Sequence, residues 1–304
     1  QGNFAVVDAA IVAAAQHRLA VILDLHPHED YMNDLEKNPT SEQNFIDLWV
    51  AIAQHYSEAN YSSEVVAFEL LNEPHYYHAE SKYSDLINRT VLAIRKTSPT
   101  RLIVIGSPHG SSIEGLTSMQ SIKDPRVIYD FHFYDPYIVT HQGIHRGFEG
   151  KMIRYFHDVP YPASAVDHEA NFYAPDAPDP QRAQFELYDY VKNSWNAAQI
   201  EAAIKPAADW AHAHFTRVIC GEFGVLRNHI DAASRYRWIG DTRTALEADG
   251  IGWALWDYAD LMGITQVNGE ASTPDPVDGS THLVSGARVF EPEALTALGL
   301  THTP

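Results

Sequence analysis

The stretch that decides the fold is Val65-Val66-Ala67-Phe68-Glu69-Leu70-Leu71-Asn72-Glu73-Pro74. Its apolar run, rich in β-branched residues, predicts a buried strand. Pro74 has no N–H to donate to a neighbouring strand, so the strand is expected to end there. A carboxylate at a buried strand end is costly unless it has partners or a chemical task. Glu73 is therefore the first candidate functional residue.

A second stretch, Arg217-Val218-Ile219-Cys220-Gly221-Glu222-Phe223-Gly224, repeats this pattern. A short apolar run again ends in a glutamate, Glu222, which here lies between two glycines. Two strand-end glutamates far apart in the sequence meet only if a barrel or sheet gathers the strand ends. Paired carboxylates suit hydrolysis of a glycosidic bond, with one as proton donor and the other as nucleophile or base.

Predicted strands alternate with predicted helices along the chain, which indicates a parallel α/β arrangement. A closed barrel of this class needs eight strands, and only six are predicted, so we expect an α/β TIM (β/α)8-type barrel that is incomplete in this chain. Thr40-Ser41-Glu42-Gln43 resembles a capping box that starts one helix, whereas residues 26–30 and 257–287 are expected to be loops. The six strands are expected at 19–25, 65–71, 102–105, 127–133, 216–221 and 251–256, and further helices at 4–18, 82–97, 196–214, 232–249 and 292–298.

Residues 138–195 differ from the rest, because they are rich in Tyr, His, Pro and Asp and have weak periodicity. A stretch of this length between two strand–helix units is more typical of a functional insertion than of a plain loop. We therefore expect one catalytic barrel domain over residues 1–304, with 138–195 as an insertion subdomain flanking the cleft.

Composition restricts the partners. The 304 residues carry a formal net charge of −19, which argues against nucleic acid and anionic membranes as partners. No apolar run is long enough to span a bilayer. The single cysteine, Cys220, lies in an apolar strand and is expected to be a buried thiol. No signal peptide is visible and the chain opens in a helix-like segment, so we expect the natural start to be absent. The compartment stays open, although a polymeric substrate would favour a secreted or periplasmic enzyme.

Polar and aromatic side chains follow several of the apolar runs, at the position where barrel enzymes keep their sites. A lone strand-end histidine is usually structural, a lone tryptophan is usually core, and a lone glutamate often caps the next helix. Their occurrence at five strand ends favours a catalytic site over these ordinary roles. The residues are His26, Asn72, Glu73, His132, Tyr134, Glu222 and Trp256.

Together these motifs resemble glycoside hydrolase family 5, the cellulase family. The stretch Tyr137-Ile138-Val139-Thr140-His141-Gln142 is similar to a bacterial endoglucanase branch with an insertion subdomain after the sixth barrel strand. The resemblance rests on Val21-Ile22-Leu23-Asp24-Leu25-His26, Phe68-Glu69-Leu70-Leu71-Asn72-Glu73, Phe131-His132-Phe133-Tyr134-Asp135-Pro136, Cys220-Gly221-Glu222-Phe223-Gly224 and Gly252-Trp253-Ala254-Leu255-Trp256-Asp257-Tyr258.

The resemblance implies a retaining β-glycoside hydrolase, an endo-β-glucanase acting on β-1,4 or mixed-linkage β-glucan, with no metal and no cofactor. It gives Glu73 the role of acid/base and Glu222 that of nucleophile. The implied substrate-binding residues are His26, Asn72, His132, Tyr134 and Trp256. Retention requires carboxyl groups about 5–5.5 Å apart, and the charge of Glu222 together with burial is expected to raise the pKa of Glu73.

The chain departs from the family at its start. Two βα units and a strand-borne arginine that bonds the nucleophile are absent from this sequence, and residues 1–18 match the helix before the third barrel strand. The strands at 20–25 and 251–256 would then be open edges. We therefore expect self-association through the open barrel edge, a rearranged insertion that covers it, or poor stability.

Two other functions remain open. The spacing of His26-Pro27-His28 is that of a barrel metal site, which would suit a metal-dependent amidohydrolase-type barrel. A truncated, non-catalytic sugar-binding barrel would keep the aromatic side chains but not the chemistry. Neither the glycan linkage nor endo against exo action can be deduced from these motifs.

Overall fold

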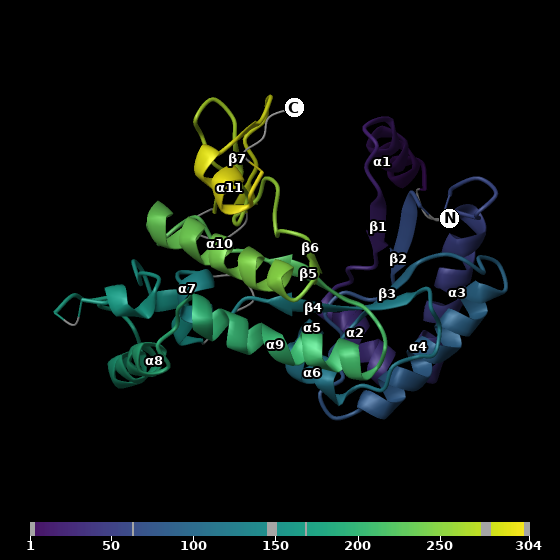
Figure 1. Cartoon of the computed structure of the whole chain (residues 1–304), viewed down its shortest axis with the longest axis horizontal. Coiled ribbons are helices and arrows are strands. Elements are labelled where there is room, and N and C mark those ends of the chain that lie inside the picture. Colours follow the sequence, from purple (N-terminus) through teal and green to yellow (C-terminus); the bar gives the residue numbers. More distant parts are fainter. Residues whose placement is uncertain (1–3, 63, 145–150, 168, 275–280, 301–304) are drawn as a thin grey trace. The chain divides into compact units, whose positions relative to one another are not determined.

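The computed structural model describes residues 4–62, 64–144, 151–167, 169–274 and 281–300 (Figure 1). The chain divides into two compact units. The first comprises Gln1–His132 with Ala207–Ile219, and the second comprises Phe133–Pro206 with Cys220–Pro304. Among the described residues, no helix has both the length and the hydropathy that a membrane crossing requires.

The first unit is built on parallel strands. Strands β1 (Val21–Asp24), β2 (Val66–Glu69), β3 (Ile103–Gly106) and β4 (Val127–Phe133) pair side by side in that order. All residues of β2, β3 and β4 are buried, which is typical of parallel strands covered on both faces. With β5 (Val218–Phe223) and β6 (Gly252–Trp253), they complete a six-stranded sheet in the order β1 to β6. The predicted α/β class and six strands are confirmed.

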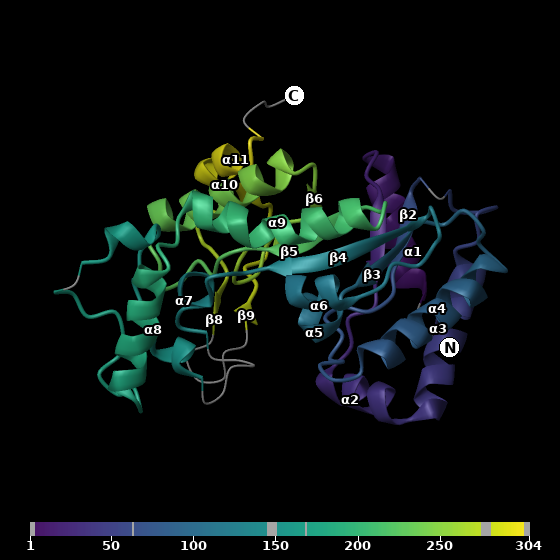
Figure 2. The same cartoon turned by 60° about the horizontal axis from the view of Figure 1, so that its bottom comes forward.

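Helices of the first unit cover this sheet through apolar faces. In both views α3 and α4 lie next to each other (Figures 1 and 2), and they pack together. The indole of Trp49 on α3 is fully buried and donates from Nε1 to the Leu70 carbonyl at 3.0 Å, which fixes α3 against the end of β2. The helices are α1 (Phe4–Gln16), α2 (Glu29–Lys37), α3 (Pro39–His55), α4 (Glu80–Arg95), α5 (Pro108–Ser111) and α6 (Ile113–Ser118), together with the end of α9 (Ala197–Ala213).

The second unit holds the end of β5 and β6, which are joined by hydrogen bonds from Ala254 N to Cys220 O and from Trp256 N to Phe223 O, both 2.9 Å. Its helix α10 packs against α11. The Cys220 thiol is buried, as predicted. The remaining elements are α7 (Tyr137–Thr140), η1 (Met152–Tyr155), η2 (Ala163–Ala165), α8 (Pro180–Lys192), α10 (Ala232–Ala248) and α11 (Pro292–Ala297), and the short strands β7 (Thr265–Gln266), β8 (Thr273–Pro274), β9 (Thr281–His282) and β10 (Val289–Phe290).

Three local predictions are corrected. Helix α2 begins at Glu29, inside the predicted loop 26–30. The cap of α3 is Asn38, whose side chain accepts from Thr40 N at 3.0 Å, so the proposed capping box is wrong. Glu42 is instead buried and pairs with Arg89 and Lys82. The predicted loop 257–287 contains β7, β8 and β9, while its residues 275–280 lie outside the described ranges.

Arg101, at the start of β3, is a fully buried cation that organises the entry to β2. Its guanidinium donates to four carbonyl oxygens, at distances between 2.6 and 3.0 Å. Burial lowers the pKa of Arg101, against the opposing charge of Glu58. The carbonyls come from three segments that precede β3, namely Tyr56, Tyr61 with Ser62, and Val66.

Replacing Arg101 by Met should therefore destabilise the protein strongly. The methionine fills much of the volume but leaves buried carbonyl oxygens without donors, and we expect a loss of about 3 kcal/mol in the free energy of unfolding. Urea unfolding followed by circular dichroism measures it. Arg126→Met, at an exposed side chain two residues beyond Asp124, is the control. Equal stability of the two variants would contradict the role given to Arg101.

Candidate active site

Glu73 lies just beyond β2, where the backbone is strained. Its φ is 43°, a left-handed conformation that is uncommon for a non-glycine residue and found most often at functional sites. Gly106 at the end of β3 makes this path possible, because a Cβ there would lie 2.6 Å from the Leu71 carbonyl oxygen. The sequence around β2 and β3 therefore holds the Glu73 carboxyl in one place.

The first unit brings together four of the predicted site residues as two pairs. His132 at the end of β4 faces Glu73, with Nδ1 3.0 Å from Oε1. His26, after β1, bonds Asn72 through Nε2 at 3.2 Å, and its Nδ1 lies 3.4 Å from the Asp24 carboxylate. Neighbouring parallel strands thus end in partnered polar side chains.

The pKa of Glu73 reverses the expectation from the sequence. Burial alone would raise this pKa, but the hydrogen bond and positive charge of His132, together with the charges of His26 and His75, outweigh it. The net result is a pKa below the ordinary value of a glutamate. The first unit therefore favours an ionised Glu73 in contact with the His132 imidazole.

The second unit supplies the other three predicted residues. The Tyr134 hydroxyl donates to Oε2 of Glu222 at 2.7 Å, which fixes the carboxylate and stabilises its charge. Trp256 follows β6 with 41% of its surface exposed, so its ring is accessible to a ligand. A Cβ at Gly224 would lie 2.0 Å from the Trp256 carbonyl oxygen, so a glycine is required where these two segments meet.

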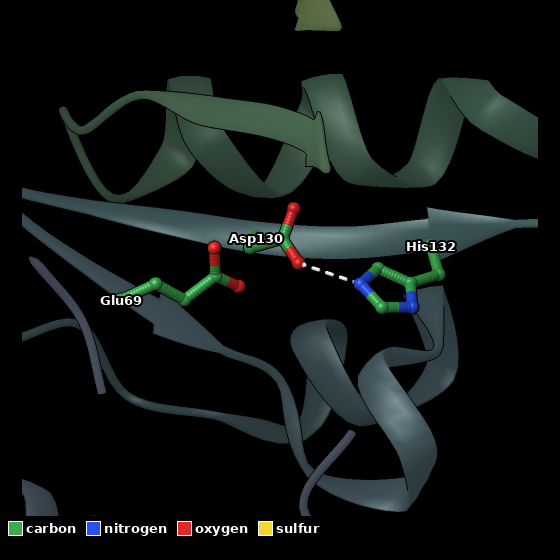
Figure 3. A group of neighbouring side chains, drawn as sticks. All are labelled: Glu69, Asp130 and His132. Atoms are coloured by element: carbon green, nitrogen blue, oxygen red, sulfur yellow. Dashed lines mark ion pairs between the residues drawn. The ribbon is translucent and has the colours of Figure 1, made fainter. Parts of the chain in front are cut away.

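Two buried acids of the first unit were not singled out in the sequence. Glu69 on β2 and Asp130 on β4 lie beside His132, and the Glu69 carboxyl points toward Asp130 (Figure 3). Asp130 is fully buried and its Oδ2 is 3.1 Å from His132 Nε2. Burial, followed by the charges of Asp130 and Asp24, raises the pKa of Glu69 far above its ordinary value. A charged residue inside an apolar strand is the signal that could have identified both acids.

Glu69, Asp130 and His132 are also the residue types that hold divalent ions, and one oxygen or nitrogen of each lies within 4.8 Å of the others. Within this group Asp130 and His132 form an ion pair, with Oδ2 3.1 Å from Nε2. His28 of the predicted His26-Pro27-His28 metal motif is the residue before α2, where its carbonyl accepts from Tyr31 and Met32.

Comparison with known families decides between the classes of enzyme. The family model described as "Cellulase (glycosyl hydrolase family 5)" matches residues 1–261. The chain belongs to this cellulase family. Membership in a glycosyl hydrolase family replaces the amidohydrolase-type hypothesis and accounts for glutamates, rather than clustered histidines, at the strand ends.

Two relatives of this cellulase-family chain are named endoglucanases. Endoglucanase C of Acetivibrio thermocellus is 28% identical over 272 residues, which cover 83% of this chain and 71% of the relative. Endoglucanase 3 of Fibrobacter succinogenes is 26% identical over 271 residues, covering 86% of this chain and 40% of the relative. This chain is thus an endoglucanase-like member of glycosyl hydrolase family 5.

Solved structures support the same fold. The cellulose synthase subunit Z of Clostridioides difficile superposes with a TM-score of 0.68 at 25% identity, covering 97% of this chain and 79% of that one. A hyperthermophilic endo-β-1,4-glucanase solved in complex with its substrate gives a TM-score of 0.66 at 22% identity, covering 96% and 76%. The TIM-barrel-type fold expected from the sequence is therefore confirmed.

Glu69→Gln should change how stability depends on pH. A folded-state pKa raised above the unfolded value means that folded Glu69 keeps a proton that the unfolded chain releases, so its stabilisation is full at acid pH and is lost as pH rises. The glutamine does not titrate. The variant should gain about 1.4 kcal/mol per pH unit relative to the parent above about pH 5.

Urea unfolding at pH 5, 6, 7 and 8 measures this difference. Glu186→Gln is the matched control, because Glu186 lies on α8 in an i,i+4 pair with Arg182 and should show a flat difference. Parallel stability curves for Glu69→Gln and the parent would mean that Glu69 is already ionised in the folded protein.

Proposed function

We propose that this chain is a retaining β-glycoside hydrolase, an endo-β-glucanase acting on β-1,4 or mixed-linkage β-glucan, with Glu73 as acid/base and Glu222 as nucleophile. The observation that carries the proposal is the contrast between their partners. Glu73 contacts an imidazole, with Oε1 3.0 Å from His132 Nδ1. Glu222 accepts from a phenol, at 2.7 Å from Tyr134. The first is suited to proton transfer, the second to a persistent carboxylate.

The proposed reaction has two steps. In the first, a Glu222 oxygen attacks the anomeric carbon while the proton held by Glu73 and His132 passes from Glu73 to the departing glycosidic oxygen, leaving a glycosyl-enzyme ester. In the second, water attacks the same carbon, Glu73 takes its proton, and the ester bond breaks to release Glu222. Two inversions give net retention of configuration.

The other predicted residues would bind the sugar. His26 and Asn72 bond each other at 3.2 Å and together offer donors and acceptors for sugar hydroxyls. The exposed ring of Trp256 suits the apolar face of a glucose unit. The preference for β-glucan follows the names of the relatives, which are endoglucanases.

Variants of the two glutamates should respond differently to the leaving group. Glu222→Gln removes the nucleophile and should lower kcat on carboxymethyl cellulose and on aryl cellobiosides alike, by at least about 10³-fold. Glu73→Gln removes the acid and should lower kcat on carboxymethyl cellulose by about 10²–10⁴-fold. It should affect formation of the glycosyl-enzyme far less with dinitrophenyl cellobioside, whose leaving group needs no proton.

Glu247→Gln, in an exposed i,i+4 pair with Arg243, serves as the control with parental activity. Proton NMR of the first product should show the β-anomer before mutarotation, and product sizes over time separate endo from exo action. An α-anomer would exclude retention, and Glu73→Gln with full activity would exclude the assigned acid. A parent that binds cello-oligosaccharides without cleaving them would establish the non-catalytic sugar binder instead.

A further inference from the structure

Behind His132 lies a second pair of carboxyls that the reaction described above does not use. Glu69 is the last residue of β2, and Asp130 precedes His132 by two residues on β4. Side chains alternate along a strand, so Asp130 and His132 lie on the same face. The register Glu69↔Val104 and Val104↔Ile128 puts Glu69 on this face as well. Figure 3 shows the three side chains arranged as a row.

The row continues without a break to Glu73. One carboxyl oxygen of Glu69 lies within 4.8 Å of the facing atoms of Asp130 and His132, Asp130 Oδ2 is 3.1 Å from His132 Nε2, and His132 Nδ1 is 3.0 Å from Glu73 Oε1. Both nitrogens of the imidazole therefore face a carboxyl group. An imidazole so placed is stabilised as the cation by each ionised neighbour.

Charge decides which acid holds a proton. Two carboxyls this close together in a buried site do not both ionise readily, because their like charges repel strongly. Asp130 lies directly against His132, which compensates its charge, whereas Glu69 lies one position farther away. Asp24, paired with Glu69 in register on β1, adds a further negative group beside Glu69.

The surroundings of the pair agree with this assignment. The titratable groups acting on Glu69 are Asp24 from β1 and Asp130 and His132 from β4. From α4 the fully buried Tyr83 faces the same acids, with its hydroxyl donating to the Gly106 carbonyl. The intervening strand β3 has the sequence Ile-Val-Ile-Gly and adds no titratable group.

We propose that Glu69 and Asp130 are positioning residues for the acid/base, with Glu69 donating its proton to ionised Asp130, which holds His132 as the proton-sharing partner of Glu73. The inference rests on the proposed role of Glu73. The Asp130 charge keeps the proton of the pair near His132, and the Glu69 hydroxyl limits how much of that charge His132 experiences. Neither acid needs to touch the substrate.

NMR titration of the His132 imidazole tests this arrangement of side chains and does not require enzymatic activity. Asp130→Asn should lower the pKa of His132 by about 1–3 units, because an opposite charge in contact is removed. Glu69→Leu should raise it, since Asp130 loses its donor. Glu69→Gln should restore the parental value, because the amide donates to Asp130 as the protonated acid does. A resonance missing from His132→Asn identifies the signal.

The pH profile of kcat/KM provides the second measurement. Its basic limb reports loss of the proton shared by His132 and Glu73, so Asp130→Asn should shift that limb to lower pH by the amount seen in the titration. Glu247→Gln should leave both measurements unchanged.

Three results would overturn the proposal. The first is a His132 titration indifferent to Asp130→Asn. The second is a Glu69→Gln variant that lowers the His132 pKa as Asp130→Asn does, which would mean that Glu69 is charged. The third is a stoichiometric shift of the His132 resonances on adding ZnCl2, reversed by EDTA, which would assign the row to a metal ion. Absence of hydrolysis in the parent would instead reject the proposed function and leave the titration result standing.

Discussion

Complete burial of β2 is the constraint on which the rest of the structure depends. Every polar group along this strand must find its partner inside the protein, since water does not reach it. At its start the Val66 carbonyl receives the Arg101 guanidinium, and past its end the Leu70 carbonyl receives the Trp49 indole. The side chains obey the same rule, because Glu69 keeps a proton and Glu73 takes an imidazole. The structural contacts and the candidate catalytic contacts thus both arise because buried polar groups need partners inside the protein.

The sequence was informative where a residue pattern corresponds to one structural role, as with apolar runs that form strands and polar residues at strand ends. Continuous apolar runs predicted β1 to β6. For β2, β3 and β4 the physical reason is that parallel strands buried on both faces leave no polar alternation. Polar residues at the ends of those runs were selected as candidate site residues, and the structure pairs His26 with Asn72, His132 with Glu73, and Tyr134 with Glu222. Family membership then followed from the same motifs, and the match over residues 1–261 confirmed it.

The failures have physical causes as well. Helix α2 was missed because its sequence is mostly charged and only Met32 and Leu35 are buried. The cap of α3 was misplaced because Asn38 before Pro39 competes with Ser and Thr as a cap, and a motif search does not weigh the two. The pKa of Glu73 was predicted in the wrong direction because burial is outweighed by His132, His26 and His75, and the first two of these lie far from Glu73 in the sequence.

A buried acid that stays protonated is unfavourable to stability at neutral pH, so its presence in β2 calls for a reason. A leucine at position 69 would fit the apolar run and remove the penalty. It would also leave Asp130 with its full charge against His132, and the imidazole would then hold the shared proton more firmly than an acid catalyst should allow. A protonated Glu69 avoids that result, because its hydroxyl reduces the negative charge of Asp130 that His132 experiences but does not remove it. On this argument one feature, a protonated Glu69 beside Asp130, both lowers the stability of the fold at neutral pH and adjusts the proton affinity of the His132–Glu73 pair.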